Sequence, residues 1–304
     1  MEEASVGEVA PRILDPRYRL TVIGIVAVVT VVAMEAMAVT TVMPTVVRSL
    51  HGRRFYSWGF TAYLLADVVG MVDAGQRTDR DGPTPSLVGG MVLFAVGLTV
   101  AASATDIWMF LAGRVLQGFG GGALIVALYV VIARALPPSL HGRAFTLTSA
   151  AWVVPSLVGP ALAGLVASTI GWRWVFGGMA PIALAGALIL VPCLRSLTTD
   201  TDTATEGNRR RLGRSWVTGL QLAVGLGALQ EAAQLANWWS LALLAAGVGL
   251  CAAPLHRLLP TGTLRLAPGL ATVVALRGLV ACAFFGAEAY IPLTLTRLQG
   301  GTAR

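Results

Sequence analysis

The chain has 304 residues, of which 56% are hydrophobic and only 12% are charged, and its mean hydropathy is +0.74. Soluble domains carry about 25% charged residues, so the composition excludes a soluble globular protein and indicates an integral membrane protein. The formal charge of +7 comes from Arg alone, because the chain contains no Lys. Most Arg residues lie in short loops between apolar runs, a pattern that indicates membrane topology and argues against nucleic acid as a partner.

Nine apolar segments follow one another along the chain, and each is about long enough to cross ~30 Å of hydrocarbon as a helix. Only helices satisfy their own backbone hydrogen bonds in lipid at this repeat length. The sequence therefore predicts an all-α membrane protein with about nine transmembrane helices. The predicted segments are residues 20–47, 58–75, 86–104, 107–136, 144–170, 174–194, 215–235, 238–255 and 268–295.

The loops that carry the Arg excess alternate along the chain, which predicts that they share one side of the membrane. We expect that side, together with the N-terminus, to be the cytoplasmic side of a multi-pass protein of the cell membrane. The loop with Arg48, Arg53 and Arg54 falls on the other side and is the exception. No cleaved signal peptide is expected, since no short apolar core with a cleavage site precedes the first segment. The supporting residues are Arg12, Arg17 and Arg19; Arg77 and Arg80; Arg134 and Arg143; Arg195 with the Arg residues of 209–214; and Arg257 with Arg265.

A short charged sequence, GQRTDRDG at residues 75–82, separates the second and third apolar segments. A polar turn between two membrane spans has to lie at a membrane face. Its pattern G-x-x-x-D-R-x-G comprises Gly75, Asp79, Arg80 and Gly82. We expect Asp79 and Arg80 to pair across the turn and to cap neighbouring helix ends, so that the loop holds one conformation until another competes.

Four further motifs occur in order along the chain. The first segment holds an acidic residue followed by a proline, Glu35 to Pro44, and the fourth holds LAGRVLQGFG around Arg114. The fifth holds PSLVGPALAG, in which the Gly-Pro pair is expected to bend the helix, and GWRWVF follows at residues 171–176. The residues of the fifth-segment motif are Pro155, Gly159, Pro160 and Gly164.

Together with the charged turn, these motifs resemble those of the major facilitator superfamily of transporters, in the same order and over nearly the whole chain. The sequence from Arg277 to Leu293 is similar to the fourteen-span drug:proton antiporter branch, of multidrug efflux type, in which two extra helices separate the halves. The resemblance implies a six-helix N-terminal bundle at 1–197, a cytoplasmic linker at 198–214, an extra two-helix insert at 215–262 and the first helix of an incomplete C-terminal bundle at 263–304. Such a member would continue for about five more helices, so the chain is expected to be truncated at its C-terminus.

Three ionisable residues inside apolar segments are the candidates for proton coupling. Glu35 lies ~16 residues and ~24 Å into the first helix, counted from its cytoplasmic end, whereas Arg114 lies ~11 Å from the outer end of the fourth helix. Their depths are therefore similar enough for direct or water-bridged contact, and a charge at such depth costs a few kcal/mol unless it is paired or faces water. Asp67, near the middle of the second segment, is the third candidate. The alternatives are a neutral, hydrogen-bonded Glu35 and an Arg114 that is only a structural clamp.

Other polar residues carry less specific assignments. Gln117, Glu231 and Glu288 are candidates for contact with substrate or protons. The sequence GFGGG at residues 118–122 is similar to a phosphate-binding loop, but no strand precedes it and no Lys is present, so close helix packing is predicted instead. The Cys and His residues lack metal-ligand spacing, and neither a cofactor motif nor a catalytic set is recognisable.

The resemblance implies a proton-coupled efflux transporter, an antiporter of small amphipathic organic compounds or drugs that works by alternating access. Its partners would be a small-molecule substrate, protons and the lipid bilayer. The alternative is a transport-incompetent truncated membrane fragment or a helper subunit that associates with another chain. The lack of a catalytic set argues against a membrane enzyme.

The Arg distribution predicts that the N-terminus, Arg77 and the cluster at residues 209–211 are cytoplasmic. A single Cys introduced at Thr205 in a Cys-free background should therefore not react with a membrane-impermeant thiol reagent in intact cells. The same Cys should react once the cells are permeabilised, which controls for its presence. Labelling at this position in intact cells would contradict the predicted orientation.

Overall fold

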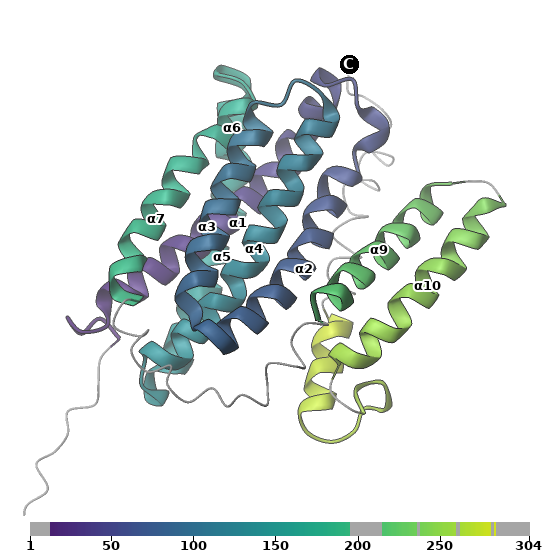
Figure 1. Ribbon diagram of the computed structural model, residues 1–304. Helices are drawn as coiled ribbons and strands as arrows, with labels where there is room; N and C mark the ends of the chain where they lie inside the picture. The colour runs from purple at the N-terminus through teal and green to yellow at the C-terminus, as the bar shows by residue number, and fades with distance from the viewer. Residues whose placement is uncertain (1–12, 195–214, 236–237, 260–261, 281–282, 284–304) are drawn as a thin grey trace, which may run out of the picture.

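The computed structural model describes residues 13–194, 215–235, 238–259, 262–280 and 283, and all regular structure within these ranges is helical. The predicted all-α fold is thus confirmed. The long helices lie side by side as a bundle, with the α9–α10 pair beside it (Figure 1). The elements are α1 (Arg19–Ser49), η1 (Arg53–Phe55), α2 (Trp58–Asp81), α3 (Pro83–Ala102), α4 (Ile107–Ala135), α5 (Pro138–Thr169), α6 (Arg173–Gly177), α7 (Met179–Leu194), α9 (Ser215–Gln234), α10 (Trp239–Leu258), η4 (Thr263–Arg265) and a short helix at Leu270–Val280.

Two groups of helices make up the bundle. Helix α4 packs against both α2 and α3, while α1 packs against α5 and α7. Helix α7 also contacts α3, and a shorter contact joins α1 to α4, so the two groups share one interior. The apolar side chains of this interior include the fully buried Phe94, Leu98 and Phe110. Helix α9 packs against α2 and pairs with α10 (Figure 1).

Seven helical stretches among the described residues are long and apolar enough to cross a membrane. They are α1, η1 with α2, α3, α4, α5, α6 with the start of α7, and α10. Helix α9 has the predicted position but is not among them, because Gln221, Gln230 and Glu231 lower its hydropathy. The last predicted segment, residues 268–295, is described only in its first part, as the apolar helix Leu270–Val280.

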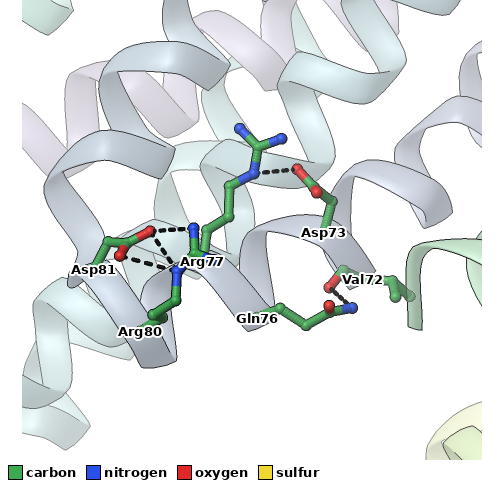
Figure 2. A network of polar contacts seen from close by, with 6 residues as sticks. All are labelled: Val72, Asp73, Gln76, Arg77, Arg80 and Asp81. Carbon is green, nitrogen blue, oxygen red and sulfur yellow. Dashed lines mark hydrogen bonds and ion pairs between the residues drawn. The ribbon is translucent and has the colours of Figure 1, made fainter. Parts of the chain in front are cut away.

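The charged sequence at residues 75–82 is the end of a helix and not a loop, which corrects the predicted boundaries. Helix α2 continues to Asp81 and α3 begins at Pro83, so that Gly82 alone connects them. Gly82 has φ +79°, a conformation that glycine adopts without steric cost, and Pro83 is favourable in the first turn of a helix. At ~36 Å, α2 exceeds the hydrocarbon thickness, so we expect its charged last turns, drawn in Figure 2, to lie at a membrane face.

Two other predicted boundaries also differ from the structure. Helix α5 begins at Pro138 instead of residue 144, because Pro is tolerated at the first helical position and the polar residues that follow continue the helix. The predicted sixth segment is divided into α6 and α7 at Gly178. Pro181 has no N–H to donate to the carbonyl four residues earlier, which is a physical reason for this interruption.

Small residues bring α4 into close contact with both of its neighbours. A Cβ atom added to Gly97 of α3 would lie 2.5 Å from the backbone N of Gln117, and one added to Gly120 would lie 2.5 Å from the carbonyl O of Gly90. Gly118 and Gly122 approach the backbone of α2 in the same way. The prediction that residues 118–122 serve helix packing is therefore confirmed.

The α3–α4 contact can be tested with two glycines of the same helix. Gly97→Ala should lower the thermal stability of the purified protein in detergent, because overpacking a closely packed contact costs about 1–3 kcal/mol. Gly89→Ala is the matched control, since nothing lies within 4 Å of its added Cβ. That variant should be neutral or slightly stabilising. Equal melting temperatures for the two variants would contradict the close approach.

Candidate functional site

The centre of the bundle contains a buried Arg whose polar contacts join three helices. Arg114 of α4 forms an ion pair with Glu35 of α1 through its Nη1 atom. Nη1 also donates to the Oε1 atom of Gln117 at 2.6 Å, and Nε donates to the backbone carbonyl of Gly59 in α2 at 2.9 Å. The exposed fractions of Glu35, Arg114 and Gln117 are 1%, 2% and 0%. The pair is therefore removed from water and held by polar groups of α1, α2 and α4.

An aromatic ring covers the same guanidinium group. The Cζ atom of Arg114 lies 4.5 Å from the ring centroid of Tyr63, within the range of a cation–π interaction. Tyr63 lies four residues after Gly59 in α2, so both face the same side of that helix. Helix α2 thus contributes a carbonyl and an aromatic face to one cation.

Two polar atoms of the cluster have no hydrogen-bond partner among the described residues. They are Oε2 of Glu35 and Nε2 of Gln117, and both belong to side chains that contact Arg114 with their other polar atom. A buried acceptor without a partner is unfavourable by about 1–3 kcal/mol. Within the described residues, the Glu35 carboxylate is therefore bound through one oxygen only.

Asp67 lies along the same α2–α4 contact but does not touch the ion pair. It follows Tyr63 by one helical turn and is half-buried. A Cβ added to Gly121 of α4 would lie 2.6 Å from Tyr63 Oη and 3.5 Å from Asp67 Oδ1, so both side chains face α4. Asp67 is thus next to the cluster, with Tyr63 between it and the ion pair.

The structure agrees with part of the sequence-based site and extends it. Direct or water-bridged contact between Glu35 and Arg114 was predicted from their depths, and the structure has the direct contact. Gln117, predicted as a possible contact for substrate or protons, follows Arg114 by three residues on the same helix and belongs to this cluster. Tyr63 and the carbonyl of Gly59 were missed. The available signal was the spacing of Tyr63 four residues before Asp67, which puts both on one helical face.

The predicted pairing at the charged end of α2 is wrong in its partner. Arg80 contacts the adjacent Asp81, with Nε to Oδ1 at 3.0 Å and Nη2 to Oδ2 at 2.9 Å, and not Asp79 (Figure 2). Asp79 is exposed on the last turn of α2, because the helix continues through Gly75 to Asp81. The contact between Arg80 and Asp81 lies at an exposed surface, where such pairs are weak.

A second ion pair lies one turn earlier on α2. Asp73 and Arg77, four residues apart, are joined at 2.9 Å between Oδ2 and Nε (Figure 2). The Nε2 atom of Gln76 donates to the carbonyl of Val72 at 3.3 Å (Figure 2). These contacts support the helical conformation of the charged sequence. They give no direct link to Arg114.

The motif of α5 faces α1 beside the ion pair. A Cβ added to Gly159 would lie 3.1 Å from Cβ of Met37 and 3.3 Å from Sδ of Met34, the residue before Glu35. Helix α5 remains one helix through both internal prolines. The motif therefore lies at the α1–α5 contact, and its role in exchange stays a prediction. Pro155 and Gly159 are buried there, and Pro160 and Gly164 are half-buried.

The remaining predicted acids lie elsewhere. Glu231 of α9 accepts a hydrogen bond from Nε1 of Trp58 at 3.3 Å, at the α2–α9 contact. Glu288 lies outside the described residues. A cavity of about 330 Å³ lies between α1, α4, α5 and the short helix Leu270–Val280, and its aliphatic, aromatic and polar lining includes Tyr129, Trp152 and Arg277.

The turn before α6 connects two helix ends on one face of the bundle. Arg173 donates to the carbonyl of Ala104 at 2.8 Å and lies over the ring of Trp172 at 4.5 Å. Trp172 packs edge-on against Phe110 and Phe176. The motif at residues 171–176 therefore joins the α5–α6 turn to the α3–α4 turn.

Comparison with known proteins assigns the chain to a family. Residues 25–298 match the Major Facilitator Superfamily, and the chain belongs to this superfamily of transporters. It is a multi-pass membrane protein and not an enzyme. The fold is similar to that of a D-xylose-proton symporter, with a TM-score of 0.50 at 15% identity over 81% of this chain and 68% of that one. At this identity the similarity concerns the fold alone.

Several relatives carry names of efflux transporters. A probable multidrug-efflux transporter of Mycobacterium tuberculosis is 34% identical, over 59% of this chain and 38% of that protein. The multidrug efflux pump SdrM of Staphylococcus aureus is 27% identical over 57% of this chain and 38% of its own length. A transporter of the acurin A biosynthesis cluster of Aspergillus aculeatus is 29% identical over 68% and 38%. The chain thus matches 38% of the length of each of these relatives.

The coupling within the buried pair can be measured by a double-mutant cycle. Arg114→Met and Glu35→Met should each lower the stability by about 3–5 kcal/mol, because each leaves a buried charge without its partner. The double variant should lose much less than the sum of the two. Unfolding in denaturant, measured in detergent micelles, gives the three free energies. Additive losses would show that the two side chains do not interact.

Proposed function

We propose that this chain belongs to a proton-coupled efflux transporter that moves small amphipathic organic compounds across the cell membrane by alternating access. The observation that carries the proposal is the buried Glu35–Arg114 pair, in which one carboxylate oxygen has no partner. The N-terminus is taken as cytoplasmic, as the Arg distribution predicts. The names of the relatives from Mycobacterium tuberculosis and Staphylococcus aureus support efflux as the direction of transport.

In the proposed mechanism, Glu35 binds the coupling proton. Protonation removes the charge of Glu35, whereas Arg114 keeps its own charge at every physiological pH. Arg114 still has the Gly59 carbonyl, Gln117 and Tyr63, which lie in α2 and α4. The attraction that holds α1 to α4 is therefore weakened, while the attachment of Arg114 to α2 remains. Because α5 packs against α1, a proton on Glu35 would allow α1 and α5 to move relative to α2 and α4.

The proposed substrates follow from the surface between α1, α4 and α5. Tyr129 and Trp152 offer aromatic faces and Arg277 offers a charge around the cavity of about 330 Å³. Such a lining favours compounds that combine an apolar ring system with a polar group. Asp67, half-buried beside Tyr63, is proposed as a second proton-binding group next to the Glu35–Arg114 pair.

A second candidate function is a membrane subunit that does not transport by itself. The chain matches 38% of the length of each named relative, so the transport activity of those relatives is not carried over to it without a test. A measurement of proton release distinguishes this case, because it reports on Glu35 without requiring net transport.

Glu35→Gln is the decisive variant for proton coupling. It keeps the size and hydrogen bonding of the side chain but cannot release a proton, so pH-driven efflux of a cationic dye such as ethidium from proteoliposomes should fall to background. Dye binding should persist, and proton release on dye binding in unbuffered detergent solution should be lost. Asp15→Asn, an exposed acid before α1, is the matched control and should behave as wild type.

If the Glu35→Gln variant transported dye at the wild-type rate under an imposed pH gradient, Glu35 would not be the proton-coupling residue. Asp67 would then be the next residue to test. If wild type releases protons on dye binding but does not transport, the chain is the non-transporting subunit. Arg114→Lys should also impair coupling, since Lys loses the planar fork that bridges Glu35 and Gly59.

A further inference from the structure

A groove of about 890 Å³ runs between α2 and α9, away from the buried ion pair. Most of its lining is apolar and includes Leu65 of α2 and Val224 of α9. Two charged side chains also line it, Arg54 and Glu231. Arg54 precedes α2 and Glu231 is in the last turn of α9, so both charges lie at the same end of the groove. The apolar part lies about two helical turns further along α2.

The two charged side chains at this end do not pair with each other. The structure, which describes both residues, forms no ion pair between Arg54 and Glu231. Glu231 Oε1 accepts one hydrogen bond, from Nε1 of Trp58 at 3.3 Å, and the guanidinium of Arg54 lies 4.7 Å from the ring centroid of Phe55. One end of the groove is therefore lined by a cation and a hydrogen-bonded carboxylate, and apolar side chains line the groove further along.

Exposed Trp residues lie near the charged end of the groove. Trp108, in the first turn of α4, packs edge-on against Phe55 at 4.8 Å, and Trp238 stacks on Trp239 at 3.8 Å at the start of α10. Trp108, Trp238 and Trp239 are all exposed. Trp residues gather at the boundary between hydrocarbon and head groups. The charges of the groove are thus at head-group depth, and its apolar part extends into the hydrocarbon.

We propose that this groove binds a zwitterionic phospholipid whose head group carries a primary ammonium. The phosphate contacts the guanidinium of Arg54, which matches the geometry of phosphate oxygens. The ammonium donates to the free acceptor positions of Glu231, and an acyl chain lies along Leu65 and Val224. An anionic head group without a cation would leave Glu231 unpaired, and a trimethylammonium group has no N–H to donate. The proposal does not depend on proton coupling.

The lipid would have a structural consequence for the α9–α10 pair. Helix α9 contacts α2 near the groove, where a Cβ added to Gly227 would lie 3.4 Å from Cδ1 of Leu65. A lipid that contacts both helices at once would fix their separation along the groove. It would thereby connect the α9–α10 pair to the bundle at one membrane face.

The test uses the whole 304-residue chain, purified in mild detergent and incubated with an equimolar mixture of phosphatidylethanolamine, phosphatidylcholine and phosphatidylglycerol with identical acyl chains. Native mass spectrometry then counts the lipids that remain after partial delipidation. Phosphatidylethanolamine should be retained about tenfold more than either competitor, as expected for one additional charge-assisted hydrogen bond. Glu231→Gln should abolish this preference, and Arg54→Gln should lower the retention of all three lipids, because each carries the phosphate that Arg54 would bind.

Matched controls lie next to the groove but outside its lining. Arg53→Gln removes a neighbouring exposed cation, and Asp106→Asn removes an exposed acid near the α3–α4 turn while keeping a side chain able to cap α4. Both should retain lipid as wild type does. Equal retention of the three lipids by wild type, or equal losses in the control and groove variants, would overturn the proposal.

A second measurement locates the lipid and does not depend on the folding of any variant. Phosphatidylethanolamine with a photoreactive group in its acyl chain should crosslink to wild-type peptides that contain Leu65 and Val224. Excess unlabelled phosphatidylethanolamine should compete, whereas phosphatidylcholine should not. Crosslinks confined to the exposed face of α5 would show general contact with the bilayer and refute a specific site.

Discussion

A guanidinium group that cannot lose its charge lies in the interior of this bundle, and the arrangement of three helices depends on it. Arg114 is 2% exposed, so water does not compensate its charge. A carboxylate from α1, an amide from α4 itself, and a carbonyl and an aromatic ring from α2 take the place of water. Such a set of contacts fixes the rotation and depth of each helix, because a displaced partner leaves a buried charge uncompensated. The pair thus specifies one arrangement of α1, α2 and α4.

Small residues allow the helices to approach closely enough for this arrangement. The carbonyl of Gly59 reaches Arg114 because α2 approaches α4 closely, and that approach requires the glycines of α4 that face the α2 backbone. The same helix uses Gly113 and Gly120 to admit α3 on its other side. In a membrane, where lipid tails are as apolar as the side chains, close packing and polar contacts hold helices together. The glycines of α4 therefore allow its close helix contacts, and its buried Arg supplies the polar contacts that accompany them.

Three of the polar groups among the described residues lie at different depths. The Glu35–Arg114 pair is in the middle of α1, the charged turns end α2 at one face, and Arg54 and Glu231 lie near the other end of α2 beside exposed Trp residues. Only the first is withdrawn from both water and head groups, which is why it suits a proposed exchange of protons. The other two lie near the membrane surfaces, where a charge remains hydrated at little cost in free energy and can contact lipid head groups. The contact of α9 with α2 then gives the α9–α10 pair its own polar anchor.

The sequence by itself determined the class of protein, the order of the helices and the two ionised residues of the central pair. Hydropathy gives the length of each segment, and length at a fixed rise per residue gives the depth of Glu35 and Arg114. It did not identify Tyr63 or the Gly59 carbonyl, because every residue has a carbonyl and many aromatic residues lie in apolar segments. The sequence predicted an ion pair between Arg80 and Asp79. In the structure α2 remains helical to Asp81, and Arg80 pairs with Asp81. Depth follows from counting along one helix, but which face meets a neighbour depends on the rotation of each helix, and only tertiary packing decides that rotation.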